Sequence, residues 1–357
     1  MNKLKQRKAE TIPISLDKSR LHNSAIGYLT ETFFSDLTGC YNWDYSDRGS
    51  YIKKLYEIGK RLNWDAQVDI DWKLLNKNLS FFLQAKANIF EHDSKYLSLN
   101  KKERSDQDRQ SYAWVISQLL HLEQFSLIVA SQLINCFPNY ESKLFFASLE
   151  FDEARHVEVF NSYLTKGVSL HYPINQNIKS LGERTIKASK WEEKFLHFFF
   201  MKKLSISLYQ HLENICVDPF LDNILELVLR DEIRHEKFGD MFLKENVLFF
   251  TEKSRGMGNL IYESCQLTSN HIFEDFVLMR FIDSFNRPEE NLIKEKILHI
   301  NDLFYLRLMP QLKTIGIPTK EQIPLFKSLD ILDYKNYEPQ EIPWEELEKP
   351  LFKKDES

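Results

Sequence analysis

Two segments of the chain, DEARH at residues 152–156 and DEIRH at residues 231–235, share the form Asp-Glu-x-Arg-His. Each lies in a stretch whose apolar residues recur with the 3.6-residue period of an α-helix. In a helix, a glutamate and a histidine three residues apart project from the same side, about one turn from each other. Glu153 and His156 could therefore bind one metal ion together.

The second segment repeats the pair as Glu232 and His235, and two facing pairs would build a metal site in the core of a helical bundle. Glu123 lies on an apolar face of another predicted helix, where an unpaired carboxylate is costly to bury. It precedes the helix break at Pro138 by 15 residues, and Glu153 follows that break by 15. Both carboxylates should stand at the same height in an antiparallel hairpin, so we expect them to meet.

The rest of the chain predicts an all-α protein. It has 357 residues, 43% hydrophobic, with only 10 glycines, and no run alternates like a strand. We expect a bundle of four long central helices with peripheral helices outside, in one domain over residues 26–315. A flexible arm, residues 1–25, should precede it, and a proline-containing arm, residues 316–357, should follow. The predicted helices span about 73–92, 108–136, 140–166, 187–216, 220–249, 254–284 and 288–310.

Several functional classes are excluded by composition. The net charge of −5 offers no polycation to nucleic acid or to an anionic membrane. The four cysteines are far apart and form no C-x-x-C pair, which argues against a zinc ribbon and against a disulfide framework. The most apolar run, residues 195–201, is much shorter than a membrane span, and the N-terminus lacks a signal-peptide core. We therefore predict a cytoplasmic protein.

The paired motifs resemble those of the ferritin-like di-iron carboxylate superfamily, which includes ribonucleotide reductase small subunits, bacterial multicomponent monooxygenases and N-oxygenases. The resemblance covers roughly residues 50–250 and implies a ferritin-like four-helix bundle core with additional peripheral helices. The matching segments are NWDAQVDIDW at 63–72, HLEQFSL at 121–127, DEARHVEVFNSYL at 152–164 and DEIRHEKFG at 231–239.

The resemblance also implies roles for individual residues. Glu123 would be a terminal ligand of a first metal that His156 completes, and Glu153 and Glu232 would bridge to a second metal held by His235. The aspartate of each motif would orient the histidine of the other, Asp231 for His156 and Asp152 for His235. Both aspartates, with Arg155 and Arg234, could equally form a structural ion-pair lattice, and the two roles are compatible.

The family pattern places a fourth carboxylate on the predicted helix 187–216, where this chain has lysine. The two motifs are 79 residues apart, and the same distance from Glu123 leads to Lys202. If the connecting loops differ by one residue, the matching position is Lys203. Alignment of this helix to the family pattern through Trp191 favours Lys203. Three glutamates and one ammonium sum to −2, which one divalent ion balances. We therefore expect a mononuclear metal bound mainly by the three glutamates and His156, with the Lys203 ammonium near the second position.

Other hypotheses remain open for this lysine. Lys203 could be neutral and itself a nitrogen ligand, because burial near a metal lowers a lysine pKa. It could extend outward from a site that has lost its activity, or be modified by the oxidant. Without any ion, the cluster would be a buried Glu–His–Arg network with too few cations for its carboxylates.

The resemblance implies a non-haem oxidoreductase that uses iron (one or two ions, with manganese possible) and dioxygen or peroxide to oxidise a small organic substrate. N-oxygenation, hydroxylation and desaturation are the candidate outcomes, with an electron-donor protein as a possible partner and a homodimer as the expected assembly. Phe160 stands where the radical tyrosine of ribonucleotide reductases would lie, so Tyr163 or Tyr209 could at most be a local electron donor; core packing is the simpler role for both. A non-catalytic subunit that acts as a binding scaffold is the alternative.

Overall fold

The computed structural model describes residues 33–45, 50–75, 89–90, 93–215, 218–278 and 288–350. Within these ranges the regular structure is helical and includes no strand, which confirms the predicted all-α class. The α-helices are α1 (Tyr51–Arg61), α2 (Ser94–Ser98), α3 (Lys101–Cys136), α4 (Tyr140–Tyr163), α5 (Gln176–Lys187), α6 (Trp191–Ile215), α7 (Pro219–Glu245), α8 (Val247–Leu267), α9 (Phe273–Leu278), α10 (Glu290–Thr314), α11 (Ile323–Ser328) and α12 (Trp344–Glu348).

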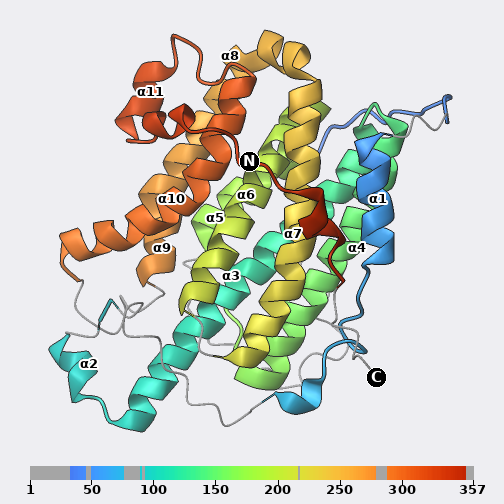
Figure 1. Cartoon of the computed structure of the whole chain (residues 1–357). Helices are drawn as coiled ribbons and strands as arrows, with labels where there is room; N and C mark the ends of the chain where they lie inside the picture. The colour runs from blue at the N-terminus through green and yellow to red at the C-terminus, as the bar shows by residue number, and fades with distance from the viewer. Residues whose placement is uncertain are drawn as a thin grey trace, which may run out of the picture.

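Four long helices, α3, α4, α6 and α7, form the centre of the molecule (Figure 1). α3 packs along α4 and against α6, while α7 packs against α6 and α4. Outside this group, α1 lies on α4 and α7, and both α8 and α10 lie on α6. The four helices that carry the predicted site residues are thus neighbours, as the hairpin argument requires.

Side-chain caps fix where two of the central helices begin. The Asn139 side chain accepts a hydrogen bond from the backbone N–H of Ser142 at 2.9 Å, directly after the Pro138 break. Asp218 accepts one from the N–H of Phe220 at 3.0 Å, and Pro219 occupies the first turn of α7. Such caps satisfy N–H groups that a helix start leaves without partners. They set the height of every residue further along each helix, including the two Asp-Glu-x-Arg-His motifs.

The predicted central helices agree with the structure within a few residues at most boundaries. The stretch predicted as helix 140–166 continues from α4 into a π-helical turn, η2 (Leu164–Val168), and 254–284 contains the π-helical turn η3 (Thr268–Ile272) between α8 and α9. The sequence patterns did not predict α1 or α5. Of the predicted helix 73–92, the described part contains only the end of a short 3-10 helix, η1 (Trp72–Leu74), and most of the rest lies outside the described residues.

The C-terminal segment packs on the bundle over its described part, residues 316–350. Gln322 donates from Nε2 to the carbonyl of Arg255 at 2.7 Å and to Asn259 Oδ1 at 2.8 Å, and Phe326 is buried. Arg230 of α7 donates to the carbonyl of Pro350 at 3.0 Å. The predicted N-terminal arm, residues 1–25, lies outside the described residues.

Helix α3 is long and apolar enough to cross a membrane by length and composition. However, 72% of its most apolar window is buried inside the bundle, as in the core helix of a soluble protein. The core that α3 forms therefore accounts for its apolar character.

A close approach between α6 and α7 requires glycine at position 239. A Cβ added to Gly239 would overlap the ring of Phe199 in α6. Gly239→Ala should therefore lower the free energy of unfolding by about 1–3 kcal/mol, measured by urea denaturation. Gly256→Ala is the control, because nothing lies within 4 Å of its added Cβ, and alanine in an exposed helix should raise stability by about 0.5–1 kcal/mol. Equal effects of the two changes would contradict the packing argument.

Candidate metal centre

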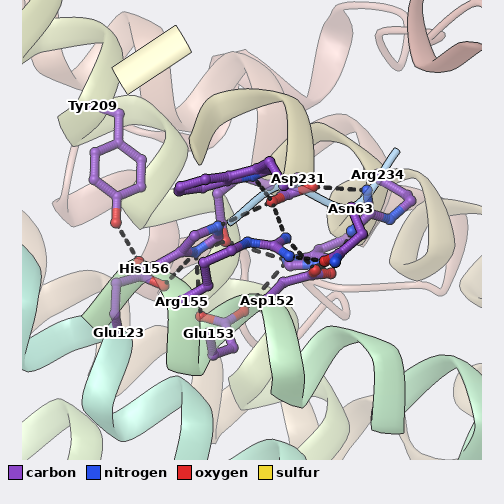
Figure 2. Close-up of polar contacts among 12 residues, drawn as sticks. Asn63, Glu123, Asp152, Glu153, Arg155, His156, Tyr209, Asp231 and Arg234 are labelled. Carbon is purple, nitrogen blue, oxygen red and sulfur yellow. Dashed lines mark hydrogen bonds and ion pairs between the residues drawn. The ribbon is translucent and has the colours of Figure 1, made fainter. Parts of the chain in front are cut away.

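Three glutamates and one histidine meet in the middle of the bundle. Figure 2 shows three of them, Glu123, Glu153 and His156. Glu123 comes from α3, Glu153 and His156 from α4, and Glu232 from α7. Each offers one ligand atom, and these four atoms lie within 4.8 Å of one another. All four side chains are completely buried. The group could hold a metal ion, and it contains four of the five residues that we predicted as ligands.

His156 stands between this cluster and an outer aspartate. Its Nδ1 lies 3.2 Å from Glu123 Oε2 and 3.6 Å from Glu232 Oε1. Its Nε2 lies 3.3 Å from Asp231 Oδ2. The ring therefore presents one nitrogen to the cluster while the aspartate holds the other, which is the role the resemblance implied for Asp231.

His235, the fifth predicted ligand, is arranged in the same way on the other side. Its Nδ1 lies 3.2 Å from Glu232 Oε1 and 3.3 Å from Glu153 Oε1, and its Nε2 lies 3.1 Å from Asp152 Oδ2. Each aspartate thus contacts the histidine of the other motif. The two Asp-Glu-x-Arg-His segments therefore contact each other reciprocally, each through its aspartate and its histidine.

Two arginines complete these reciprocal contacts (Figure 2). Arg155 lies 2.5 Å from Asp152 Oδ1 and 2.8 Å from Asp231 Oδ2. Arg234 lies 2.8 Å from Asp231 Oδ1 and also pairs with Asp152. Two carboxylates and two guanidinium groups balance each other, so the aspartates belong to an ion-pair lattice and contact the histidines at the same time.

Lys202, rather than Lys203, completes the cluster. Its Nζ lies 2.7 Å from Glu153 Oε1, 2.8 Å from Glu232 Oε1 and 3.4 Å from Glu123 Oε2. The prediction of Lys203 was therefore wrong by one residue, and the 79-residue motif offset was the better guide. The physical reason is that α6 is apolar on nearly every side around Phe198–Ile206, so its periodicity did not identify the face that meets the glutamates.

Lys203 belongs to a second buried cluster. Its Nζ lies 2.7 Å from Glu236 Oε1 and 3.0 Å from Asp240 Oδ1, and Arg307 of α10 lies 2.9 Å from Glu236 Oε2. Because the side chain of Lys203 is only 1% exposed, the hypothesis that this lysine extends outward is wrong. Its pairing with Glu236 and Asp240 also argues against a ligand role.

Two aromatic residues touch the site from outside. The Tyr209 hydroxyl donates to Glu123 Oε1, and the Tyr209 ring stacks on Phe160 with centroids 5.8 Å apart. Trp64 donates from Nε1 to Asp231 Oδ2 at 2.9 Å and stacks on the ring of His156 at 6.3 Å. The sequence singled out Tyr209 only as one of two tyrosines, and Trp64 only as part of the segment that carries the resemblance. Tyr163, the other tyrosine, donates instead to Asp218 at 2.6 Å.

The surrounding carboxylates favour protonation of both imidazoles and of Lys202. Burial lowers the pKa of each histidine, but hydrogen bonds to carboxylates outweigh it and raise the pKa of His156 to about 9 and that of His235 to about 10. Burial likewise disfavours the Lys202 ammonium, and the three glutamates outweigh it and raise the lysine pKa. For Glu153, burial and the neighbouring glutamates raise the pKa to about 8 against the opposing effect of Lys202.

The spacing of the ligand atoms fits one ion on the His156 side. His156 Nδ1 lies 3.2 Å from Glu123 Oε2, 3.9 Å from Glu153 Oε2 and 3.6 Å from Glu232 Oε1. Ligands bound at about 2.1 Å in a tetrahedron stand about 3.4 Å apart. Lys202 Nζ contacts Glu153 Oε1 and Glu232 Oε1, which face His235. It also contacts Glu123 Oε2 and Glu153 Oε2, which lie near His156, so the ammonium competes with metal for carboxylate oxygens on both sides of the cluster.

Comparisons with family models, with curated proteins and with solved structures found no match. The assignment of a function therefore depends on the chemistry of this site.

Removing the Lys202 charge should destabilise the metal-free protein. Lys202→Met leaves three buried carboxylates without their ammonium, which should lower the free energy of unfolding by about 3–5 kcal/mol in urea denaturation. It should also shift the imidazole ¹⁵N resonances of His156 and His235, because Lys202 shares carboxylate oxygens with both.

Lys203→Met is the matched control, since it removes an equally buried lysine that pairs with Glu236 and Asp240. It should destabilise the protein while leaving the two imidazole resonances in place. If the imidazole resonances shifted in the Lys203 variant and not in the Lys202 variant, the result would contradict the placement of Lys202 in the glutamate cluster.

Proposed function

We propose that the chain is a ferritin-like protein of the di-iron carboxylate type whose centre binds one divalent transition metal, iron or manganese, in place of two. The observation that carries the proposal is the convergence of three glutamates and His156 within the spacing of a single ion, with the Lys202 ammonium in contact with all three glutamates where the family pattern has a fourth carboxylate. Carboxylate and imidazole together form a donor set that suits both metals.

Charge balance supports one ion. With Glu153 ionised, as a metal ligand must be, Glu123, Glu153, Glu232 and the Lys202 ammonium together carry −2, while the outer aspartates are balanced by Arg155 and Arg234. Either two imidazolium protons or one divalent ion brings the inner cluster to zero. Two divalent ions would leave a buried excess of positive charge, which is costly away from water.

The proposed activity is the oxidation of a small organic substrate with dioxygen or peroxide, by N-oxygenation, hydroxylation or desaturation. The bound metal would supply the redox chemistry. Glu123, Glu153, Glu232 and His156 would hold it, while Asp231 would keep Nδ1 of His156 directed at it.

Other residues would position a ligand and exclude water. The Tyr209 hydroxyl would hold Glu123 Oε1 in place through the hydrogen bond that it donates. Complete burial of the ligands keeps water from the centre. An electron-donor protein and a second copy of the chain are the partners that we propose for this activity.

A non-catalytic scaffold is the second candidate, and one observation favours it. Lys202, His156 and His235 already supply three cationic groups to the three glutamates when no ion is bound. The cluster would then be a polar core that fixes the packing of the four helices, and the chain would act as a partner of an active subunit.

Metal content separates one ion from two. After anaerobic loading with Fe²⁺ and removal of excess metal, the wild-type protein should retain one equivalent at the cluster, measured by elemental analysis. Lys202→Glu restores a fourth carboxylate and should retain two. Lys203→Met is the control and should still retain one. Two equivalents at the wild-type cluster would exclude the mononuclear proposal, and none would favour the scaffold.

Reaction with dioxygen separates an enzyme from a metal-binding scaffold. Addition of dioxygen to the ferrous protein should oxidise the iron and produce near-ultraviolet charge-transfer absorption, followed by stopped-flow spectroscopy. Glu153→Gln preserves the shape of the side chain but removes a ligand charge, and it should abolish the signal. A wild-type protein that stays colourless and ferrous in air would contradict a redox role.

A further inference from the structure

A second pair of histidines lies on the far side of α6, away from the buried glutamates. His211 of α6 is 8% exposed, and neither of its ring nitrogens has a hydrogen-bond partner in the described part of the chain. Nearly all buried polar groups in proteins have such a partner. Burial, together with the nearby His299 and Lys296, lowers the pKa of His211 to about 4. The ring is therefore neutral at physiological pH, with a nitrogen lone pair free to bind a ligand.

The neighbouring ring belongs to α10. The ring centroids of His211 and His299 lie 6.2 Å apart at an angle of 54°. His299 is exposed, and its Nε2 lies 3.4 Å from Nδ2 of Asn214, which is one turn beyond His211 on α6. The two helices touch directly here, since Ser207 Oγ donates to the carbonyl of Leu303 at 3.1 Å.

This geometry suits a cation shared by the two imidazoles. A metal bound at about 2.1 Å from one nitrogen of each ring holds the centroids about 5 Å apart in a tetrahedral site and about 6.4 Å apart in a linear one. The observed 6.2 Å lies near the linear end of that range, so a tetrahedral site requires His299 to move closer to His211. The exposed His299 can approach further by changing its rotamer, and the Asn214 amide can turn to present its oxygen.

We propose that His211 and His299, with Asn214 and water, bind a late first-row divalent cation of the Zn²⁺ class. Imidazole favours such ions, whereas the carboxylate-rich inner cluster suits iron and manganese. The site is independent of the inner cluster: His211 lies two residues beyond Tyr209, about 200° around α6, and faces α10 instead of the four-helix core. The bound ion would clamp α10, whose Arg307 pairs with Glu236, onto α6.

The test uses Zn²⁺ alone and a full-length chain whose inner cluster is disabled by Glu153→Gln and Glu232→Gln. Equilibrium dialysis should show one equivalent of Zn²⁺ bound to this protein. Adding His299→Ala should weaken binding at least about tenfold, and because His299 is exposed, this change should leave the fold intact. His271→Ala removes another exposed histidine, in η3, and should leave binding unchanged. Equal binding with and without His299 would overturn the proposal.

A spectroscopic measurement identifies the ligands directly. Cu²⁺ bound to the same background should show electron paramagnetic resonance splitting from two imidazole nitrogens, reduced to one in His299→Ala and also in His211→Phe. Splitting that persists from two nitrogens in both variants would assign the ion to other residues. Because Glu153 and Glu232 are replaced in this background and the splitting is compared with and without His299, the outcome does not depend on whether the wild-type inner cluster binds iron.

Discussion

The neutralisation of three carboxylates buried at one point is the constraint on which the structure depends. Glu123, Glu153 and Glu232 come from three helices and are completely excluded from water. Such groups remain ionised only where cations and hydrogen-bond donors reach them with good geometry. Lys202 from the fourth helix contacts all three, so α3, α4, α6 and α7 must keep their mutual register for the charges to balance. The helix caps at Asn139 and Asp218 maintain that register from outside the cluster.

The repeated motif supplies most of the charged groups in this arrangement. One five-residue pattern supplies a ligand pair, an aspartate for the opposite histidine and an arginine that holds both aspartates. Replacing buried ion pairs by apolar residues of similar volume is often neutral or stabilising. Stability alone therefore does not account for a centre built from so many charged groups, and this supports a chemical role for it.

The sequence predicted the parts of the site that follow from periodicity and repetition. The Glu/His spacing and the equal distances from Pro138 were sufficient to bring Glu123 to the two motifs, because helix geometry is regular over such lengths. The lysine was assigned to the wrong position because one residue turns a side chain by 100° and α6 is apolar all round. Trp64 was not predicted as a neighbour of Asp231 because it lies just after the short helix α1, whose position is set by tertiary packing and not by any local pattern.

Lysine at the fourth position changes what the centre can do without leaving it incomplete. Simple loss of a carboxylate would leave the second metal position with unpaired oxygens, whereas Lys202 contacts the two oxygens that face His235. The same oxygens cannot bind a second divalent ion while the ammonium stays there. An ion held by His156 and the three glutamates would likewise share carboxylate oxygens with Lys202 and would displace the proton on Nδ1 of His156. In the proposed centre, metal binding would therefore be coupled to the protonation of the histidines, with one ion and two imidazolium protons as alternative ways to balance the same buried charge.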